Sequence, residues 1–130
     1  MYDGGGEPAQ RVDVRINERE ILEIGSQLAA NDDVIFDAHD LIVAPGLIDL
    51  HVHVYEGTGI FSVNSANAGL RTGVTTLLDT GSVGALNYET FHNYVIPEAA
   101  EDIFALPNIS QLGAVGNHNC KPFFGELHDL

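Results

Sequence analysis

The ten residues at positions 45–54, Pro-Gly-Leu-Ile-Asp-Leu-His-Val-His-Val, decide how this sequence folds. After the Pro-Gly turn, the apolar and β-branched residues predict a strand over residues 47–54. Side chains alternate across a strand, so one face of it carries Asp49, His51 and His53. The opposite face is aliphatic and is expected to pack under helices. It consists of Ile48, Leu50, Val52 and Val54.

The polar face of this strand predicts a metal site. Burying an acid and two imidazoles costs free energy unless these groups are paired or bound to a metal. Two imidazoles placed two residues apart on a rigid strand can direct their nitrogens at one cation about 2.0–2.1 Å away. We therefore predict His51 and His53 as ligands of a divalent cation, and Asp49 as a hydrogen-bond partner rather than a ligand. A His-x-His pair by itself is a weak signal, and the polar triple on an apolar strand strengthens it.

Beyond this strand the sequence alternates between helix and strand patterns. Helices are expected over residues 62–71, 88–95 and 125–130. Strands are expected over 74–79 and over 103–106 with 109–115, which together hold a third strand split by Pro107. Such alternation predicts parallel βαβ units with right-handed crossovers. A barrel of eight units needs about 250 residues. The sequence after Gly46 is therefore either a small open α/β sheet or the first part of a barrel.

Residues 1–45 have a different rhythm, with short segments of alternating or apolar residues between turns. They predict a small antiparallel β unit with strands over 12–17, 20–25, 32–38 and 41–44. This part of the chain carries no pattern that indicates chemistry.

The composition excludes several classes of protein. The chain has 130 residues, five Lys and Arg, and a formal net charge of −14, which disfavours nucleic acid because no basic patch faces the phosphates. No apolar run reaches the roughly 20 residues that span a bilayer, and the first residues do not resemble a signal peptide. We expect a cytoplasmic protein with no membrane partner. Its single cysteine, Cys120, permits no internal disulfide.

The stretch around His51 and His53 resembles the first-strand motif of the amidohydrolase superfamily. In those enzymes it also follows a β-rich segment, which belongs to a small β-sandwich. Residues 69–82 resemble the second-strand region of the dihydroorotase-like and deacetylase-type members. Asn-Ile-Ser at 108–110, followed by Leu-Gly at 112–113, is similar to the third strand of the deacetylase-type group.

This resemblance implies an α/β fold, namely the N-terminal part of a (β/α)8 TIM-type barrel with about three βα units. Residues 1–45 would be a partial β-sandwich segment, and residues 46–130 the first strands and helices of an incomplete barrel. It also implies one or two divalent cations, usually zinc, that activate a water to cleave an amide, cyclic amide or ester of a small-molecule substrate. The lysine, two histidines and aspartate that complete such sites lie on later strands. Lys121 follows the third strand too closely to be that lysine.

The resemblance therefore assigns two metal ligands and no catalytic acid or base to these residues, and we expect the 130-residue fragment alone to be inactive. His118 falls just past the third strand and is a candidate for substrate contact. Asp79 is better interpreted as capping the turn near Gly81 and Ser82 than as catalytic. His39, His92 and His128 are expected to be solvated, and Cys120 lacks a nucleophile signature.

Two other hypotheses remain open on the sequence. The protein could be a non-catalytic barrel homologue that serves as a binding or assembly subunit. Alternatively, the 130 residues could form an independent small domain, whose unpaired apolar edge would favour aggregation or a homo-oligomer.

Overall fold

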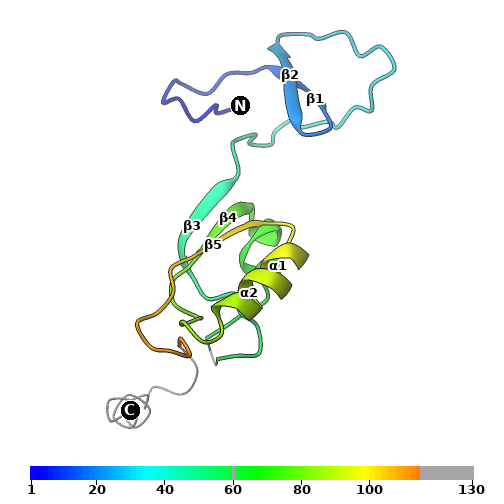
Figure 1. Ribbon diagram of the computed structural model, residues 1–130. Helices are drawn as coiled ribbons and strands as arrows, with labels where there is room; N and C mark the ends of the chain where they lie inside the picture. The colour runs from blue at the N-terminus through cyan, green and yellow to red at the C-terminus, as the bar shows by residue number, and fades with distance from the viewer. Residues whose placement is uncertain (60, 115–130) are drawn as a thin grey trace, which may run out of the picture. The chain divides into compact units, whose positions relative to one another are not determined.

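A parallel sheet follows Gly46 in the computed structural model of the protein, which describes residues 1–59 and 61–114. Strands β3 (Leu47–Val52), β4 (Val74–Asp79) and β5 (Asp102–Ala105) pair in that order, and both pairs are parallel (Figure 1). Each strand thus lies beside the next strand along the chain. This arrangement confirms the mixed α/β class.

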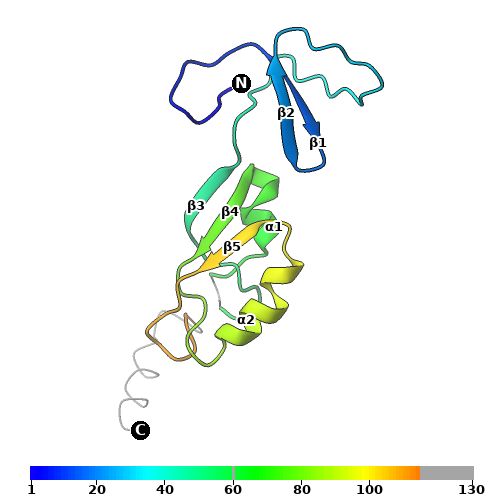
Figure 2. The ribbon, with the colours of Figure 1, turned by 45° about the horizontal axis from the view of Figure 1, so that its top comes forward.

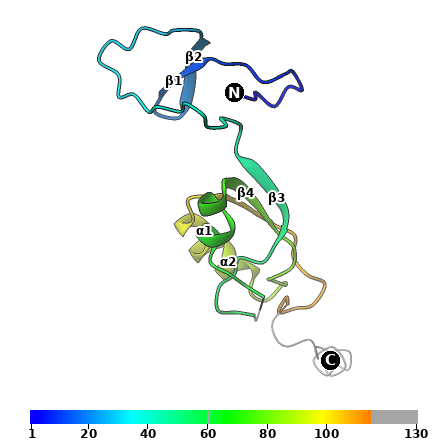
Figure 3. The ribbon, with the colours of Figure 1, turned by 180° about the vertical axis from the view of Figure 1, so that it is seen from behind.

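Helical segments connect these strands and cover one face of the sheet (Figures 1 and 3). They are α1 (Ser65–Ala68), η1 (Leu70–Thr72), α2 (Tyr88–Tyr94) and η2 (Ile96–Glu98). The helix predicted over residues 62–71 is therefore shorter than expected. Asn64 is the N-cap of α1, and its side chain accepts a hydrogen bond from the Ala66 N–H. Gly69 ends α1 and separates it from the 3-10 helix η1.

The core lies between this face of the sheet and the helices. Its buried side chains are Val52, Val54, Leu77, Val83, Phe91 and Ile103. Phe91 projects from α2 and is fully buried. The expectation that the whole aliphatic face of β3 is covered is wrong, because Ile48 and Leu50 are 63% and 69% exposed. The buried cluster reaches β3 only at its carboxyl end, at Val52.

The first 45 residues form a separate compact unit, Met1–Pro45. It contains an antiparallel hairpin of β1 (Asp13–Asn17) and β2 (Glu20–Gly25) (Figure 2). The Arg15 guanidinium braces it by pairing with the carboxylates of Glu23 and Asp33. No described helix in the chain is long and apolar enough to cross a membrane.

The strands predicted over 32–38 and 41–44 are wrong, since the structure has no strand in either segment. Val34 is fully exposed, and Phe36 and Ile42 are about four-fifths exposed. Apolar, β-branched residues form a strand only where a neighbouring strand supplies hydrogen bonds and a covering layer buries them. The described residues offer these segments neither.

The first part of the predicted third strand, 103–106, corresponds to β5, but its second part, 109–115, is wrong where it is described, because residues 109–114 form bends and turns. This loop is held instead by the loop after β4. The N–H groups of Asn108 and Ala114 donate to the carbonyls of Val83 and Gly81 at 2.7 and 2.9 Å. Gly84 is required there, because a Cβ at this position would lie 1.8 Å from the Ser110 carbonyl oxygen. The helix predicted over 125–130 lies outside the described residues.

At the opposite end of the sheet, Glu101 precedes β5 and is 5% exposed. Its Oε1 accepts from the Leu70 N–H at 3.0 Å, and so caps the start of η1. That backbone hydrogen bond lowers the pKa of Glu101 below its ordinary value of 4.5, although burial acts in the opposite direction. The ionised carboxylate therefore stabilises the folded state.

We predict that this stabilisation is lost in acid. Because the folded pKa of Glu101 is depressed, its contribution is present above pH 4.5 and disappears as the pH falls through the folded value. Glu101→Gln keeps an oxygen acceptor but loses the charge, so the free energy of unfolding at pH 7 should fall by about 1 kcal/mol. Urea unfolding at pH 7 and in acid would show the two proteins converging at low pH. The exposed Glu98→Gln serves as the control, and a constant difference at every pH would contradict the prediction.

Candidate metal centre

The two predicted ligands lie together at the carboxyl end of β3. His51 is exposed and His53 is half-buried. Their ring centroids are 5.7 Å apart and the rings are tilted by 80°. The register with β4 shifts between Asp49 and Val52, so this end of β3 is irregular. Asp49 Oδ1 accepts from the His51 N–H at 2.9 Å, which agrees with a structural role for this acid.

A hydrogen bond joins the His53 ring to the loop that follows the next strand of the sheet. Nδ1 of His53 lies 3.0 Å from the Oγ of Ser82, in the loop that follows β4. Ser82 is only 2% exposed, whereas His53 is half-buried. This contact uses Nδ1 and leaves Nε2 as the ring nitrogen that can face a cation. Sequence reasoning did not identify Ser82. The signal available was its place just past a strand parallel to β3, since the carboxyl ends of parallel strands share one edge of a sheet.

Asp79 organises the loop that carries Ser82. The side chain is fully buried, and its Oδ1 accepts from the N–H groups of Ser82 and Gly81 at 2.8 and 3.2 Å. The turn-capping interpretation is confirmed. Its Oδ2 also accepts from the N–H of Val54 at 2.9 Å, which the sequence did not indicate. One carboxylate thus joins the end of β3, immediately after His53, to the loop beyond β4.

Thr80 adds an unsatisfied hydroxyl to this region. Its N–H donates to the Val52 carbonyl at 3.1 Å, so strand pairing continues past Asp79. Thr80 therefore lies at the carboxyl end of β4, directly after Asp79. The Thr80 Oγ1 is buried and has no hydrogen-bond partner among the described residues. Buried hydroxyls normally have a partner, so this atom is available to a water or a ligand.

These features fit a cation in part. The donors are two imidazoles, which suit zinc, on adjoining positions of one strand face. Residues 1–59 and 61–114 contain no group of three or more His, Cys, Asp or Glu side chains that could hold a metal. A stable protein site for zinc takes at least three ligands. The described residues therefore bring together two candidate ligands, and a complete site would need more.

The other histidines considered from the sequence do not join this pair. His39 is exposed beside Asp40, and His92 is exposed on α2 with its ring stacked on Tyr88, as expected for solvated side chains. His118, the candidate for substrate contact, lies outside the described residues, as do Cys120, Lys121 and His128.

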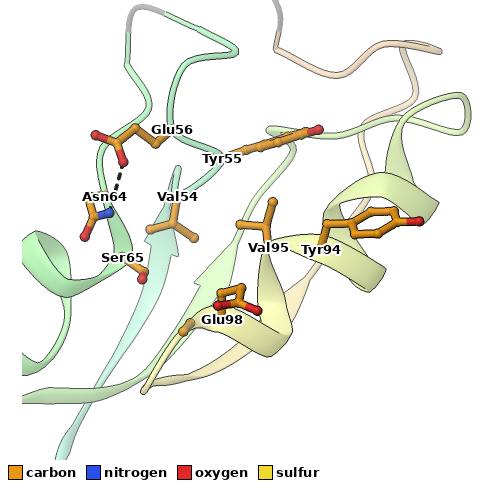
Figure 4. A pocket seen from close by; sticks show the side chains of 9 residues that line it. Val54, Tyr55, Glu56, Asn64, Ser65, Tyr94, Val95 and Glu98 are labelled. Atoms are coloured by element: carbon orange, nitrogen blue, oxygen red, sulfur yellow. Dashed lines mark hydrogen bonds between the residues drawn. The ribbon is translucent and has the colours of Figure 1, made fainter.

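A pocket of about 270 Å³ lies away from the histidine pair, between the β3–α1 loop and the α2–η2 segment (Figure 4). Val54 forms part of its floor, and an Asn64–Glu56 hydrogen bond of 2.9 Å spans one wall. Neither His51 nor His53 lines it. This pocket therefore belongs to the helix side of the sheet.

Known proteins of similar sequence and structure are hydrolases of one superfamily. A deacetylase from Agrobacterium fabrum is 36% identical over 129 residues, which are 98% of this chain and 31% of the relative. A dihydroorotase from Bacillus licheniformis is 44% identical over 80 residues, 59% of this chain and 18% of the relative. The crystal structure of a dihydroorotase matches with a TM-score of 0.78 at 35% identity, over 89% of this chain and 31% of that one.

This chain thus spans less than a third of the length of each of these relatives. No protein-family model matches it. The similarity to the deacetylase nevertheless extends over 98% of this chain. The chain belongs to the amidohydrolase superfamily.

Proposed function

We propose that the protein is a metal-dependent hydrolase and that His51 and His53 bind its divalent cation, most naturally zinc. The observation that carries this proposal is the ring pair at the end of β3, with the His53 Nδ1 engaged by Ser82 and Nε2 left for a metal. A bound cation of this kind supplies activation of a water molecule and polarisation of a scissile carbonyl.

The residues described here would contribute the rigid part of such a site. His51 and His53 hold the cation at the strand end, while Asp79 and Ser82 keep the His53 side of it in place. The hydroxyl of Thr80 supplies a further polar atom at the same edge. We assign no general acid or base to these residues, and one or two cations are compatible with the ligands they offer.

We further propose that β3, β4 and β5 are the first strands of a (β/α)8 barrel and that Met1–Pro45 is part of a small β-sandwich. Sequential parallel pairing with helices on one face supports the barrel, because its strands follow one another in this way. Active sites of barrels lie at the carboxyl ends of the strands, where both histidines are found. The remaining ligands would then come from later strands.

The relatives limit the substrates to propose. Their names are deacetylase and dihydroorotase, so we propose a small molecule with an amide, a cyclic amide or an ester as the bond that is cleaved. Residues of the site other than His51 and His53 would determine which of these three bonds is cleaved.

The direct test is removal and return of the metal. The product of the whole gene should contain at least one zinc per chain by elemental analysis, and should hydrolyse one of a panel of N-acetyl amino acids, dihydroorotate and acetate esters. Dialysis against a chelator is expected to abolish that activity, and added zinc to restore it. A protein that contains no metal and binds none would instead support the non-catalytic binding or assembly subunit.

A further inference from the structure

We infer that Ser82 is a positioning residue that fixes the tautomer and orientation of the His53 ring, and that Asp79 in turn fixes Ser82. The expected effect of Ser82 on metal affinity rests on the proposed metal site. The geometry of the ring itself is independent of whether a metal binds.

The contact between Ser82 and His53 can be made in two ways. Either Nδ1–H donates to the serine Oγ, or the serine hydroxyl donates to an unprotonated Nδ1. In the first case Nε2 has a free lone pair, and in the second it carries the hydrogen. Only the first arrangement allows Nε2 to bind a cation. If His53 is a ligand through Nε2, Ser82 must therefore act as the acceptor.

The fold holds Ser82 in a fixed position beside the His53 ring. Its side chain is 2% exposed, and its own N–H is held by the Asp79 carboxylate at 2.8 Å. The same carboxylate holds the N–H of Val54, next to His53. Both partners of the 3.0 Å contact are thus tied to one buried acid, and their separation is set by the fold rather than by solvent.

The consequence is a difference between the two histidines. His51 is exposed, and its backbone N–H, rather than its ring, is bound by Asp49. The structure gives the His53 ring a hydrogen-bond partner in the loop after β4. Outer hydrogen-bond partners of metal-ligating histidines typically contribute about 10–100-fold in metal affinity. We expect Ser82 to contribute within that range through His53.

The test uses nitrogen NMR on the whole gene product labelled in its histidine rings, measured without metal at pH 8. In the unmodified protein His53 should be the Nδ1–H tautomer. Ser82→Ala is expected to shift it towards the Nε2–H tautomer that free imidazole side chains favour. Ser82→Thr retains the hydroxyl and should restore the Nδ1–H form. Ser62→Ala, in the half-buried loop between β3 and α1, is the matched control and should leave His53 unchanged.

Zinc titration of the same variants supplies a second readout. Ser82→Ala should bind zinc about 10–100-fold more weakly, with Ser82→Thr close to the unmodified protein. An Nε2–H tautomer in the unmodified protein, or an unchanged tautomer in Ser82→Ala with the fold intact by circular dichroism, would overturn the inference. If the tautomer shifts as expected and no variant binds zinc, the role of Ser82 stands and the proposed metal function is the part that fails.

Discussion

Replacing His51 or His53 with asparagine is expected to remove the bound cation and to abolish hydrolysis. Each side chain is one of the two ligands that we propose, and their ring centroids lie 5.7 Å apart. Asparagine preserves polarity but does not place an imidazole nitrogen, which suits zinc, in the same position. The loss of zinc affinity should exceed the roughly 100-fold that marks the upper end for an outer hydrogen-bond partner. Elemental analysis and a zinc titration of the purified variants measure it.

The matched control for these variants is His92→Asn. His92 is an exposed histidine on α2, stacked on Tyr88, so its loss tests a general effect of removing an imidazole. We expect it to retain metal and activity. Full zinc content and full activity in both His51→Asn and His53→Asn would refute the assignment of these residues as ligands.

The second large effect is expected for Asp79→Ala. This substitution leaves three backbone N–H groups, those of Val54, Gly81 and Ser82, without their acceptor in a buried region. Each unsatisfied buried donor costs about 1–3 kcal/mol, so the free energy of unfolding should fall by at least about 3 kcal/mol. Against the small net stability of a typical domain, such a loss is large. Urea unfolding followed by circular dichroism would measure it.

Two variants test whether the loss of stability is specific to the Asp79 carboxylate. Asp102→Ala removes an exposed aspartate at the start of β5 and should change the stability by less than about 0.5 kcal/mol. Asp79→Asn keeps one oxygen but turns an amide donor towards a donor N–H, so an intermediate loss is expected. If the free energy of unfolding falls by less than about 1 kcal/mol in Asp79→Ala, water replaces the carboxylate as acceptor. The hydrogen bonds of Asp79 would then have no stabilising role.

The strand that carries the histidines was predictable because its evidence is local. A turn at Pro45-Gly46, an apolar run and the period of two are all properties of ten neighbouring residues. The parallel order of β3, β4 and β5 followed from the alternation of strand and helix patterns. The assignment of His51 and His53 as ligands remains a prediction that the metal experiments will test.

The prediction of strands over 32–38 and 41–44 was wrong because local sequence is not sufficient to form a strand. Their sequences satisfy the local pattern, but a strand also needs a paired neighbour and a covering layer, and both are tertiary properties. The same reason explains Ile48 and Leu50, which carry the correct alternation and are nevertheless exposed. In the turns of residues 109–114, hydrogen bonds to the loop after β4 replaced the expected strand pairing.

The sequence by itself thus determined the class of fold, the place of the His-x-His strand and the family to which the chain belongs, because all three reside in residue types at short spacing. Only the tertiary structure decided what surrounds His53. Ser82 and Asp79 lie 29 and 26 positions away from it along the chain, and no local pattern connects them. They meet because parallel pairing brings the carboxyl ends of β3 and β4 to one edge, where a buried carboxylate must find backbone donors. That packing requirement gives one of the two imidazoles, the half-buried ring of His53, a fixed orientation.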